Sequence, residues 1–188
     1  MTGRKEMNQN TVKKALRERL RRERSQRFIP SNFNLILKSP ELVAASTVAS
    51  YFSYGVEPST TEINQALLRD GKRLLLPRVR GELLDWIEWG GDESQLTITQ
   101  NLSEPIGNPV SDLDGIDVII VPALHIDRNG YRLGQGGGFY DRALAHLPGW
   151  KIGLVHAGEL STTDLPREPH DIALDAAATP SVLVRFKS

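Results

Sequence analysis

An uninterrupted apolar run, DVIIVPAL at residues 117–124, constrains the fold more than any other feature of the sequence. A strand that alternates apolar and polar residues can leave one face in water, but this run needs cover on both faces. Parallel sheets with helices on both sides meet that need. The run therefore predicts a central strand of an α/β fold.

Strand and helix patterns alternate along the rest of the chain. Helical patterns with recognisable starts or ends lie at 11–27, 32–37, 59–70, where Ser59 to Glu62 reads as a capping box, and near Ala143. Strand patterns lie at 47–53, 73–79, 83–89, 96–99, 151–155 and 182–186. The alternation predicts one three-layer, Rossmann-like domain over 1–188, with a mostly parallel central sheet flanked by helices and with residues 1–10 frayed.

A glycine-rich segment, RLGQGGGFYDR at 132–142, separates the predicted central strand from a predicted helix. In open α/β sheets, ligands bind beyond the carboxyl ends of the strands. Glycines allow close backbone approach, and the start of a helix favours phosphate. The P-loop pattern is absent, and the dinucleotide pattern fails because Phe139 stands where its third glycine belongs. The segment is predicted to cradle a phosphate; a plain flexible turn is the alternative.

Carboxylates near this segment raise the question of a metal. Asp141 follows the glycines directly, and a carboxylate beside a bound phosphate is unfavourable unless a cation lies between them, so Asp141 is a candidate Mg²⁺ ligand. Its alternative role is compensation of the helix dipole. Arg132 is a candidate phosphate clamp or a surface ion pair. Asp171 and Asp175 follow a proline-containing turn, a pattern more typical of an ordinary loop.

The N-terminal segment is strongly basic although the chain as a whole has no net charge. Residues 4–27 contain ten Lys or Arg and three Glu, a local net charge of +7. Either this is a solvated helix or part of it meets an anion. Lys13 and Arg17 share a helical face, and the basic residues at 19–24 are expected to be mostly solvated. Neutral total charge and the lack of aromatic residues before Phe28 disfavour a nucleic-acid arm.

Composition excludes several classes of protein. The chain has no cysteine, so disulfides, thiol catalysis and cysteine-ligated metals are excluded. No apolar run reaches the roughly 18 residues of a membrane-spanning helix, and no signal-peptide pattern is present, which predicts a cytoplasmic protein without a membrane partner. His125, His146 and His156 are expected to be structural.

Seven segments, in order, resemble the 5-formyltetrahydrofolate cyclo-ligase, or 5,10-methenyltetrahydrofolate synthetase, family. They are KKALR (13–17), GVEPST (55–60), LLLPRV (74–79), IGNP (106–109), DVIIVPALHID (117–127), NGYRLGQGGGFYDR (129–142) and HDIALD (170–175). The resemblance implies an ATP- and Mg²⁺-dependent ligase that converts 5-formyltetrahydrofolate, with or without a polyglutamate tail, to 5,10-methenyltetrahydrofolate with release of ADP and phosphate. It implies a monomer that binds no nucleic acid.

The resemblance also implies a role for each residue that matches the family's motifs. The implied ATP ligands are Lys13, Arg17, Arg132, Gly134, Gln135, Gly136, Gly137, Gly138, Phe139 and Tyr140. The implied Mg²⁺ ligands are Asp141 and Asp171, and the implied folate contacts are Phe52, Tyr54, Glu57, Gln135 and Phe139. Arg132, Tyr140 and Asp141 are the implied catalytic residues.

Two positions depart from the family's commonest pattern. Gln135 stands where an aromatic or basic residue is frequent, and Phe139 stands where tyrosine is frequent. Both changes affect substrate contacts, but neither removes an implied metal ligand or phosphate clamp. A non-catalytic protein that binds a nucleotide or phosphate ligand on the same fold is the alternative function.

Overall fold

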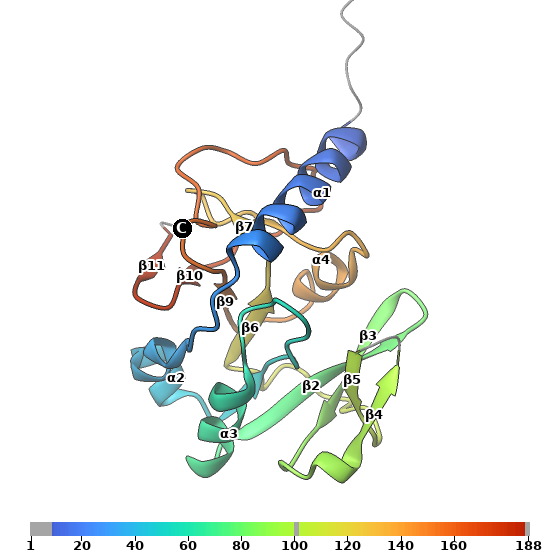
Figure 1. Ribbon diagram of the computed structural model, residues 1–188. Coiled ribbons are helices and arrows are strands. Elements are labelled where there is room, and N and C mark those ends of the chain that lie inside the picture. Colours follow the sequence, from blue (N-terminus) through green and yellow to red (C-terminus); the bar gives the residue numbers. More distant parts are fainter. Residues whose placement is uncertain (1–8, 100–101, 187–188) are drawn as a thin grey trace, which may run out of the picture.

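A seven-stranded sheet forms the centre of the protein in the computed structural model, which describes residues 9–99 and 102–186 (Figure 1). The strand order is β11-β10-β9-β6-β1-β2-β3. The strands are β1 (Thr47–Ala49), β2 (Arg73–Arg80), β3 (Leu83–Glu88), β6 (Val118–Pro122), β9 (Trp150–Leu154), β10 (Ala176–Ala178) and β11 (Leu183–Arg185). The inner strands run parallel, and the edge strands β3 and β11 are antiparallel to their neighbours. The predicted α/β fold with a mostly parallel sheet is confirmed.

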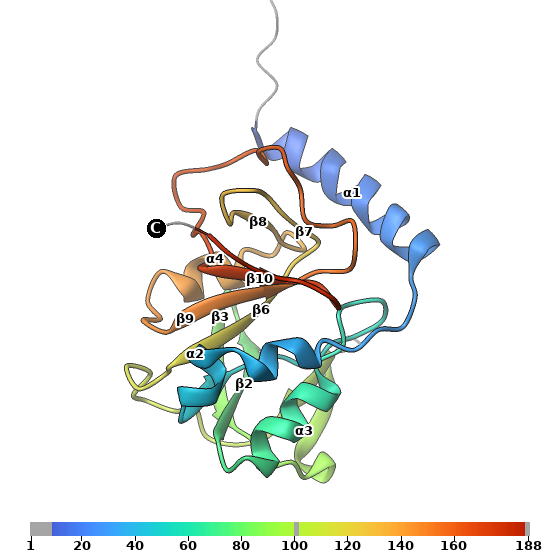
Figure 2. The same cartoon turned by 90° about the vertical axis from the view of Figure 1, so that its left-hand side faces the viewer.

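Strand β6 is buried on both faces, as its apolar run predicts. Val118 and Ile120 join one hydrophobic cluster, whereas Ile119 and Val121 join the other. The first cluster includes residues of the 3₁₀ helix η1 (Asn34–Lys38), α2 (Pro40–Ala44) and α3 (Thr61–Arg69), and the second includes α4 (Phe139–Leu144) and β7 (His125–Ile126). Helices thus cover both faces of the sheet, which makes three layers (Figure 2).

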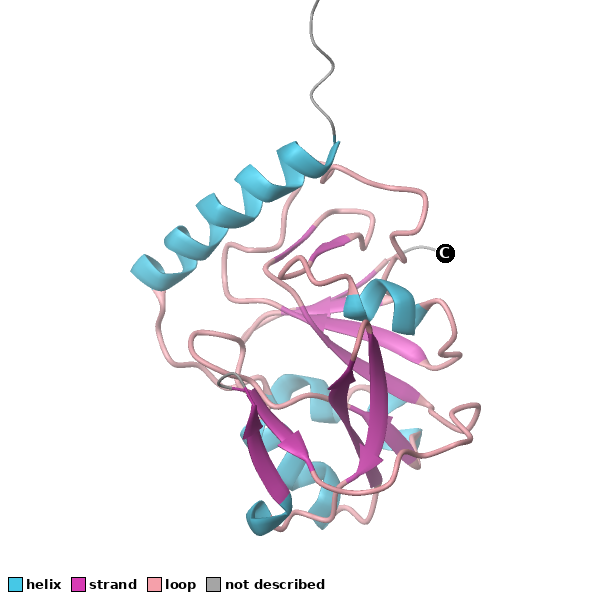
Figure 3. Cartoon of the chain, turned by 90° about the vertical axis from the view of Figure 1, so that its right-hand side faces the viewer, coloured by secondary structure: helices cyan, strands magenta, loops and turns pink. Residues whose placement is uncertain are grey.

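Helix α1 (Gln9–Arg27) lies across the end of the sheet toward which β6 points (Figure 1). Below it lies a separate hairpin of β4 (Leu96–Thr99) and β5 (Leu102–Pro105), preceded by the 3₁₀ helix η2 (Glu93–Gln95) (Figure 3). A third small sheet pairs β7 with β8 (Arg132–Leu133). Among the described residues, no helix combines the length and the apolar character needed to cross a membrane.

The end of α3 matches its prediction, but its start does not. Gly71 has φ +74°, and the Gly71 and Lys72 N–H groups donate to Leu68 and Leu67 carbonyls, which closes the helix as expected. The predicted capping box is wrong: the cap residue is Thr60, and its hydroxyl donates to the Tyr51 carbonyl instead of capping α3. The hydroxyl is taken by a tertiary contact that the local sequence does not encode.

Other boundaries differ by a few residues. The strand expected at 47–53 ends at Ala49, and the first helix begins at Gln9 instead of Thr11. Strands β5, β7, β8 and β10 and helix α2 were not predicted. The expectation of frayed residues at 1–10 falls mostly on residues 1–8, which lie outside the described part of the chain, and residues 9 and 10 are helical.

Asp127 is a fully buried carboxylate that joins two loops. Its Oδ1 accepts hydrogen bonds from the Asn129 and Tyr131 N–H groups, at 2.8 and 3.0 Å. Its Oδ2 accepts from the Leu165 N–H at 3.0 Å and from Arg167 Nη2 at 3.1 Å. Because every partner is a donor, the buried negative charge is compensated, and the turn between β7 and β8 is tied to the long loop after β9.

We expect Asp127→Ala to lower the free energy of unfolding by about 3–5 kcal/mol, because it leaves three N–H groups without their acceptor and removes the buried partner of Arg167, which keeps only a longer contact with Asp164. Asp127→Asn should lose less, since an amide oxygen can still accept. Asp112→Ala is the matched control: that carboxylate is exposed and accepts one N–H, from Asp114, so its loss should cost about 1 kcal/mol or less. Urea unfolding measures all three, and equal losses for Asp127→Ala and Asp112→Ala would contradict the expectation.

Candidate active site

A cleft of about 400 Å³ lies between α1, the β4–β5 hairpin and the glycine-rich segment. Every residue that the sequence analysis assigned to the site lines this one cleft. They are Lys13, Arg17, Phe52, Tyr54, Glu57, Arg132, Gly134, Gln135, Gly136, Gly137, Gly138, Phe139, Tyr140, Asp141 and Asp171. Tyr51 and Phe52 follow β1, and Pro122 ends β6, so the cleft lies at the carboxyl ends of parallel strands.

The glycine-rich segment needs glycine at two positions because of its backbone. Gly136 and Gly138 have φ of +108° and +69°, which side chains other than glycine rarely allow. Two arginines hold the segment, one from α1 and one at the segment's own end: Arg17 Nε donates to the Gly134 carbonyl at 3.1 Å, and Arg142 Nη2 donates to the Gly137 carbonyl at 2.9 Å. The segment is therefore a shaped and tethered loop.

Arg132 is buried, so the alternative of a surface ion pair is wrong. Its side chain is 3% exposed, and its Nη2 lies 2.6 Å from Asp141 Oδ1. Burial lowers the pKa of Arg132, while the negative charges of Asp141 and Asp171 oppose this shift. Asp141 already has a cation beside it in Arg132. Its carboxylate therefore does not require a metal to balance its charge.

Two buried polar atoms of residues that line this cleft have no hydrogen-bond partner. They are the Tyr140 hydroxyl and Arg132 Nε. Burial is the main cause that raises the pKa of Tyr140 far above its ordinary value, with the negative charge of Glu57 adding to the shift. The hydroxyl is therefore protonated at neutral pH and can donate. Since unpaired buried donors are uncommon in folded proteins, both atoms point to a ligand that accepts hydrogen bonds.

Glu57 is a partly buried carboxylate that also lines the cleft. The Tyr54 N–H donates to Glu57 Oε2 at 3.3 Å, and Gln135 Nε2 donates to Glu57 Oε1 at 3.4 Å. Both bonds are long, so they compensate the charge only weakly. Burial raises the pKa of Glu57, and these two bonds oppose the shift.

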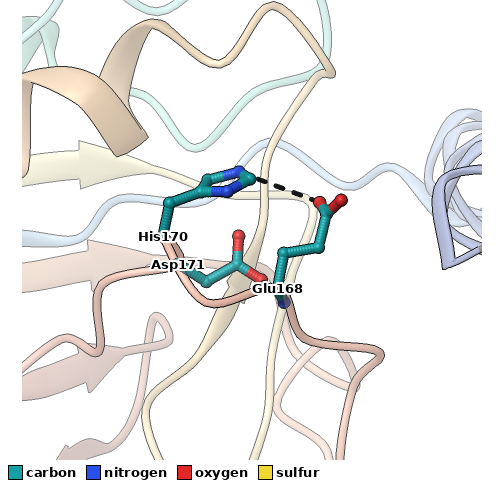
Figure 4. Close-up of side chains that lie close together, drawn as sticks. All are labelled: Glu168, His170 and Asp171. Carbon is teal, nitrogen blue, oxygen red and sulfur yellow. Dashed lines mark hydrogen bonds and ion pairs between the residues drawn. The ribbon is translucent and has the colours of Figure 1, made fainter.

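Lys13 joins α1 to the loop that carries Asp171. Its Nζ lies 2.6 Å from Asp171 Oδ2 and 2.8 Å from Glu168 Oε2, and its side chain is 5% exposed. Within the described residues, Glu168, His170 and Asp171 place ligand atoms within 4.8 Å of one another (Figure 4). Sequence reasoning missed Glu168, although its position three residues before Asp171 was a signal.

Other predicted roles can be compared with the contacts. Asp175 is structural, because its Oδ2 accepts from the Lys151 N–H at 2.7 Å where β9 begins. The His156 ring contacts the rings of Phe28 and Phe33, in agreement with a structural role. Most basic residues at 19–24 are exposed, as expected, but Arg24 is buried because it meets a carboxylate far along the chain.

Comparison with known proteins identifies the family. Residues 4–180 match the 5-formyltetrahydrofolate cyclo-ligase family. The chain belongs to this family. The 5-formyltetrahydrofolate cyclo-ligase of Mycolicibacterium smegmatis is 35% identical over 147 residues, which cover 73% of this chain and 75% of that protein. The Escherichia coli K12 enzyme of the same name is 36% identical over 151 residues, which cover 76% and 82%.

Solved structures agree with this membership. The NMR structure of Aquifex aeolicus 5,10-methenyltetrahydrofolate synthetase superposes with a TM-score of 0.80 at 26% identity, over 94% of each chain. A 5,10-methenyltetrahydrofolate synthetase from Mycoplasma pneumoniae shares the fold, with a TM-score of 0.62 at 21% identity, over 91% of this chain and 98% of that one. As a cyclo-ligase family member, the protein is an enzyme of the ligase class.

The raised pKa of Glu57 predicts a pH-dependent effect on stability. A carboxyl group whose folded-state pKa lies above its ordinary value of 4.5 favours folding most below that value, and this contribution is lost as the pH rises through the folded-state pKa. Glu57→Gln should therefore match the wild type near about pH 4 and become the more stable protein by about pH 8. Thermal melting across this range measures the difference.

Glu62→Gln serves as the control for that experiment. Glu62 is an exposed carboxylate five residues away, and it accepts a hydrogen bond from Asn34 Nδ2 at 2.8 Å. Glu62→Gln therefore measures the effect of losing the negative charge of an exposed carboxylate. If Glu57→Gln lost stability relative to the wild type as the pH rose, burial of Glu57 would not control its ionisation.

Proposed function

We propose that the protein uses ATP and Mg²⁺ to convert 5-formyltetrahydrofolate to 5,10-methenyltetrahydrofolate, releasing ADP and phosphate. The observation that carries the proposal is the convergence of all fifteen assigned residues on one cleft, from segments up to 158 positions apart. The names of the relatives, cyclo-ligase and methenyltetrahydrofolate synthetase, support the reaction. Acting as a single-domain monomer is part of the same proposal.

The chemistry needs activation of an oxygen that is a poor leaving group. The formyl oxygen attacks the γ-phosphorus of ATP, an O–P bond forms, and the bond from that phosphorus to ADP breaks. The second folate nitrogen then attacks the activated carbon and loses its proton, the C–O bond breaks, and phosphate departs. Such phosphoryl transfers depend on positioning and charge neutralisation, so no protein nucleophile is required.

The cationic side of the cleft suits the phosphates of ATP. Lys13, Arg17 and Arg132 line it together with the glycine-rich segment. Arg132 is the best placed of the three to bind an incoming oxygen, because its Nε has no partner and it is held by Asp141. Gly136 and Gly138 keep the loop free of side chains, so that backbone can approach the phosphates.

The carboxylates of the cleft fit a magnesium ion. Mg²⁺ takes oxygen ligands and is commonly held by one or two carboxylates together with substrate phosphates. Asp171 and Asp141 are the proposed ligands, and Glu168 adds a carboxylate beside Asp171. When bound, the ion would neutralise phosphate charge. Lys13 now pairs with Asp171 and Glu168, so it would exchange these partners for phosphate oxygens.

The part of the cleft lined by Phe52, Tyr54 and Glu57 suits the folate. Glu57 can accept hydrogen bonds from N–H groups of a pterin, and Phe52 and Tyr54 offer aromatic faces beside it. Phe52 is held edge-on against Trp89, with ring centroids 4.9 Å apart. Gln135 reaches Glu57 with its amide, so a neutral donor stands here where relatives often carry an aromatic or basic residue.

The decisive test is a direct assay. The protein is mixed with 5-formyltetrahydrofolate and Mg·ATP, and the near-ultraviolet absorbance of the methenyl product is followed, with ADP measured in parallel. We expect both products in equal amounts and none without ATP. Saturable binding of Mg·ATP with no product would instead support a non-catalytic nucleotide-binding protein.

Tyr140→Phe should separate activity from stability. The variant removes a buried hydroxyl that has no partner, so the melting temperature should stay equal or rise slightly. Turnover should fall by roughly 10²-fold if the hydroxyl donates to the reacting oxygen in the transition state. A variant with normal turnover would remove Tyr140 from the proposed catalytic residues.

A further inference from the structure

Helix α1 docks on the protein mainly through charged side chains. Lys13, Arg17, Arg21 and Arg24 follow one another at spacings of four, four and three, so they share one helical face. Leu20 is the one hydrophobic residue of α1 that is buried; Lys13 and Arg24 are the other buried residues of the helix. Val12 and Leu16 are only partly buried, so the placement of α1 depends largely on where these cations find partners.

The cations differ in where those partners lie. Lys13 and Arg17 line the cleft, and their partners are cleft residues. Arg21 donates to Gln135 in the glycine-rich segment, through Nε to its Oε1 at 2.9 Å and through Nη2 to its backbone oxygen. A ligand in the cleft can compete for these contacts. Arg24 and its partner Glu159 do not line the cleft, so a ligand there does not compete directly for the contact between them.

Arg24 is fixed at four points. Its Nε lies 2.7 Å from Glu159 Oε1, and its Nη2 lies 2.6 Å from Glu159 Oε2. The same Nη2 donates to the carbonyls of Ala123 and Leu124, at 2.7 and 3.2 Å. Its side chain is 2% exposed. Ala123 and Leu124 directly follow β6, so this contact joins α1 to the carboxyl end of the central strand.

Glu159 is fixed in turn. Its Oε2 also accepts from the His156 N–H at 2.7 Å, and the Glu159 N–H donates to the His156 carbonyl at 3.1 Å. The carboxylate therefore has a defined position in the loop after β9. A bidentate pair between a fixed carboxylate and a guanidinium sets direction as well as distance, which apolar contacts alone do not.

We infer that Arg24 and Glu159 are a positioning pair for nucleotide binding, which sets the angle of α1 so that Lys13 and Arg17 reach the phosphates. Neither residue touches the nucleotide. The inference rests on the proposed function for the identity of the ligand. Eleven residues separate Lys13 from Arg24, about 16 Å along a helix, so a tilt of about 10° at Arg24 displaces Lys13 by about 3 Å.

The test compares variants chosen to keep the fold. Removing one partner of a buried ion pair is destabilising, whereas a neutral replacement of both is often tolerated. The main variant is therefore Arg24→Met with Glu159→Gln, in which the glutamine oxygen can still accept from the His156 N–H. Arg24→Lys keeps the charge but lacks the planar fork. Arg22→Ala is the matched control, because Arg22 is exposed on the same helix.

Two measurements follow for each protein. The first is the affinity for Mg·ATP by calorimetry without folate, so that no turnover is needed. The second is limited trypsin digestion, with mass spectrometry to follow cleavage after Lys13, Lys14 and Arg17, sites that every variant retains. Melting temperatures are recorded alongside.

We expect the double variant to bind Mg·ATP about tenfold more weakly, at the lower end of the losses that follow removal of orienting partners around metal ligands. Trypsin should cleave α1 faster, while the apparent KM for 5-formyltetrahydrofolate stays unchanged. Arg24→Lys should show a smaller loss of the same kind, and it decides the matter if the double variant does not fold. Arg22→Ala should behave as the wild type.

The inference would be overturned if the double variant and Arg22→Ala showed equal Mg·ATP affinity and equal cleavage of α1, whatever their ligase turnover. A loss confined to the melting temperature would overturn it as well, since that is a structural role. Failure of the proposed function would give a different result, because the wild type would bind Mg·ATP but form no methenyl product. The ratio of Mg·ATP affinities between the wild type and the double variant would still test the positioning pair.

Discussion

Burial of β6 on both faces is the constraint on which the rest of the structure depends. Val118 to Val121 alternate between two hydrophobic clusters, and each cluster needs a layer of helices above it. A sheet covered on both faces favours parallel strands, whose carboxyl ends meet at one edge. The segments that follow β1 and β6 therefore open at the same place, where the cleft lies.

Charges in that cleft are arranged as mutual pairs. Arg132 is held by Asp141, and Lys13 is held by Asp171 and Glu168. An unpaired charge buried in this way would be strongly unfavourable, so the pairs let the protein keep ionic groups in a poorly solvated place. A ligand that carries both phosphates and a divalent cation can replace both members of a pair at once. This is a physical reason behind the proposal of a magnesium–nucleotide complex as the ligand.

The basic excess of the N-terminal segment has a local explanation. Lys13, Arg17, Arg21 and Arg24 form contacts within the protein, from the cleft to the end of β6. These contacts make one side of α1 specific for the protein surface beneath it. A diffuse patch for nucleic acid would instead present its cations to solvent. These four cations thus belong to the contact between α1 and the protein surface beneath it, and two of them, Lys13 and Arg17, line the cleft.

Local sequence patterns were sufficient for the features that depend on local physics. The apolar run of β6 predicted its two-sided burial, and the helical pattern at 59–70 predicted the end of α3, since each depends on neighbouring residues alone. The fifteen residues assigned through the family resemblance all line the cleft, but other lining residues, Glu168 among them, were not assigned. Strand β10 escaped prediction because its three alanines carry no strand signal and are buried by the strands around them.

Only the tertiary structure decided which partner each polar group found. Thr60 bonds to Tyr51 instead of capping α3, and Arg24 is buried because Glu159, 135 residues away, lies against it. Asp141 pairs with Arg132, and Glu168 joins Asp171 beside Lys13. A sequence specifies which groups can donate and accept, but the pairing depends on distances between segments that are remote along the chain. Those distances exist only once the sheet has assembled.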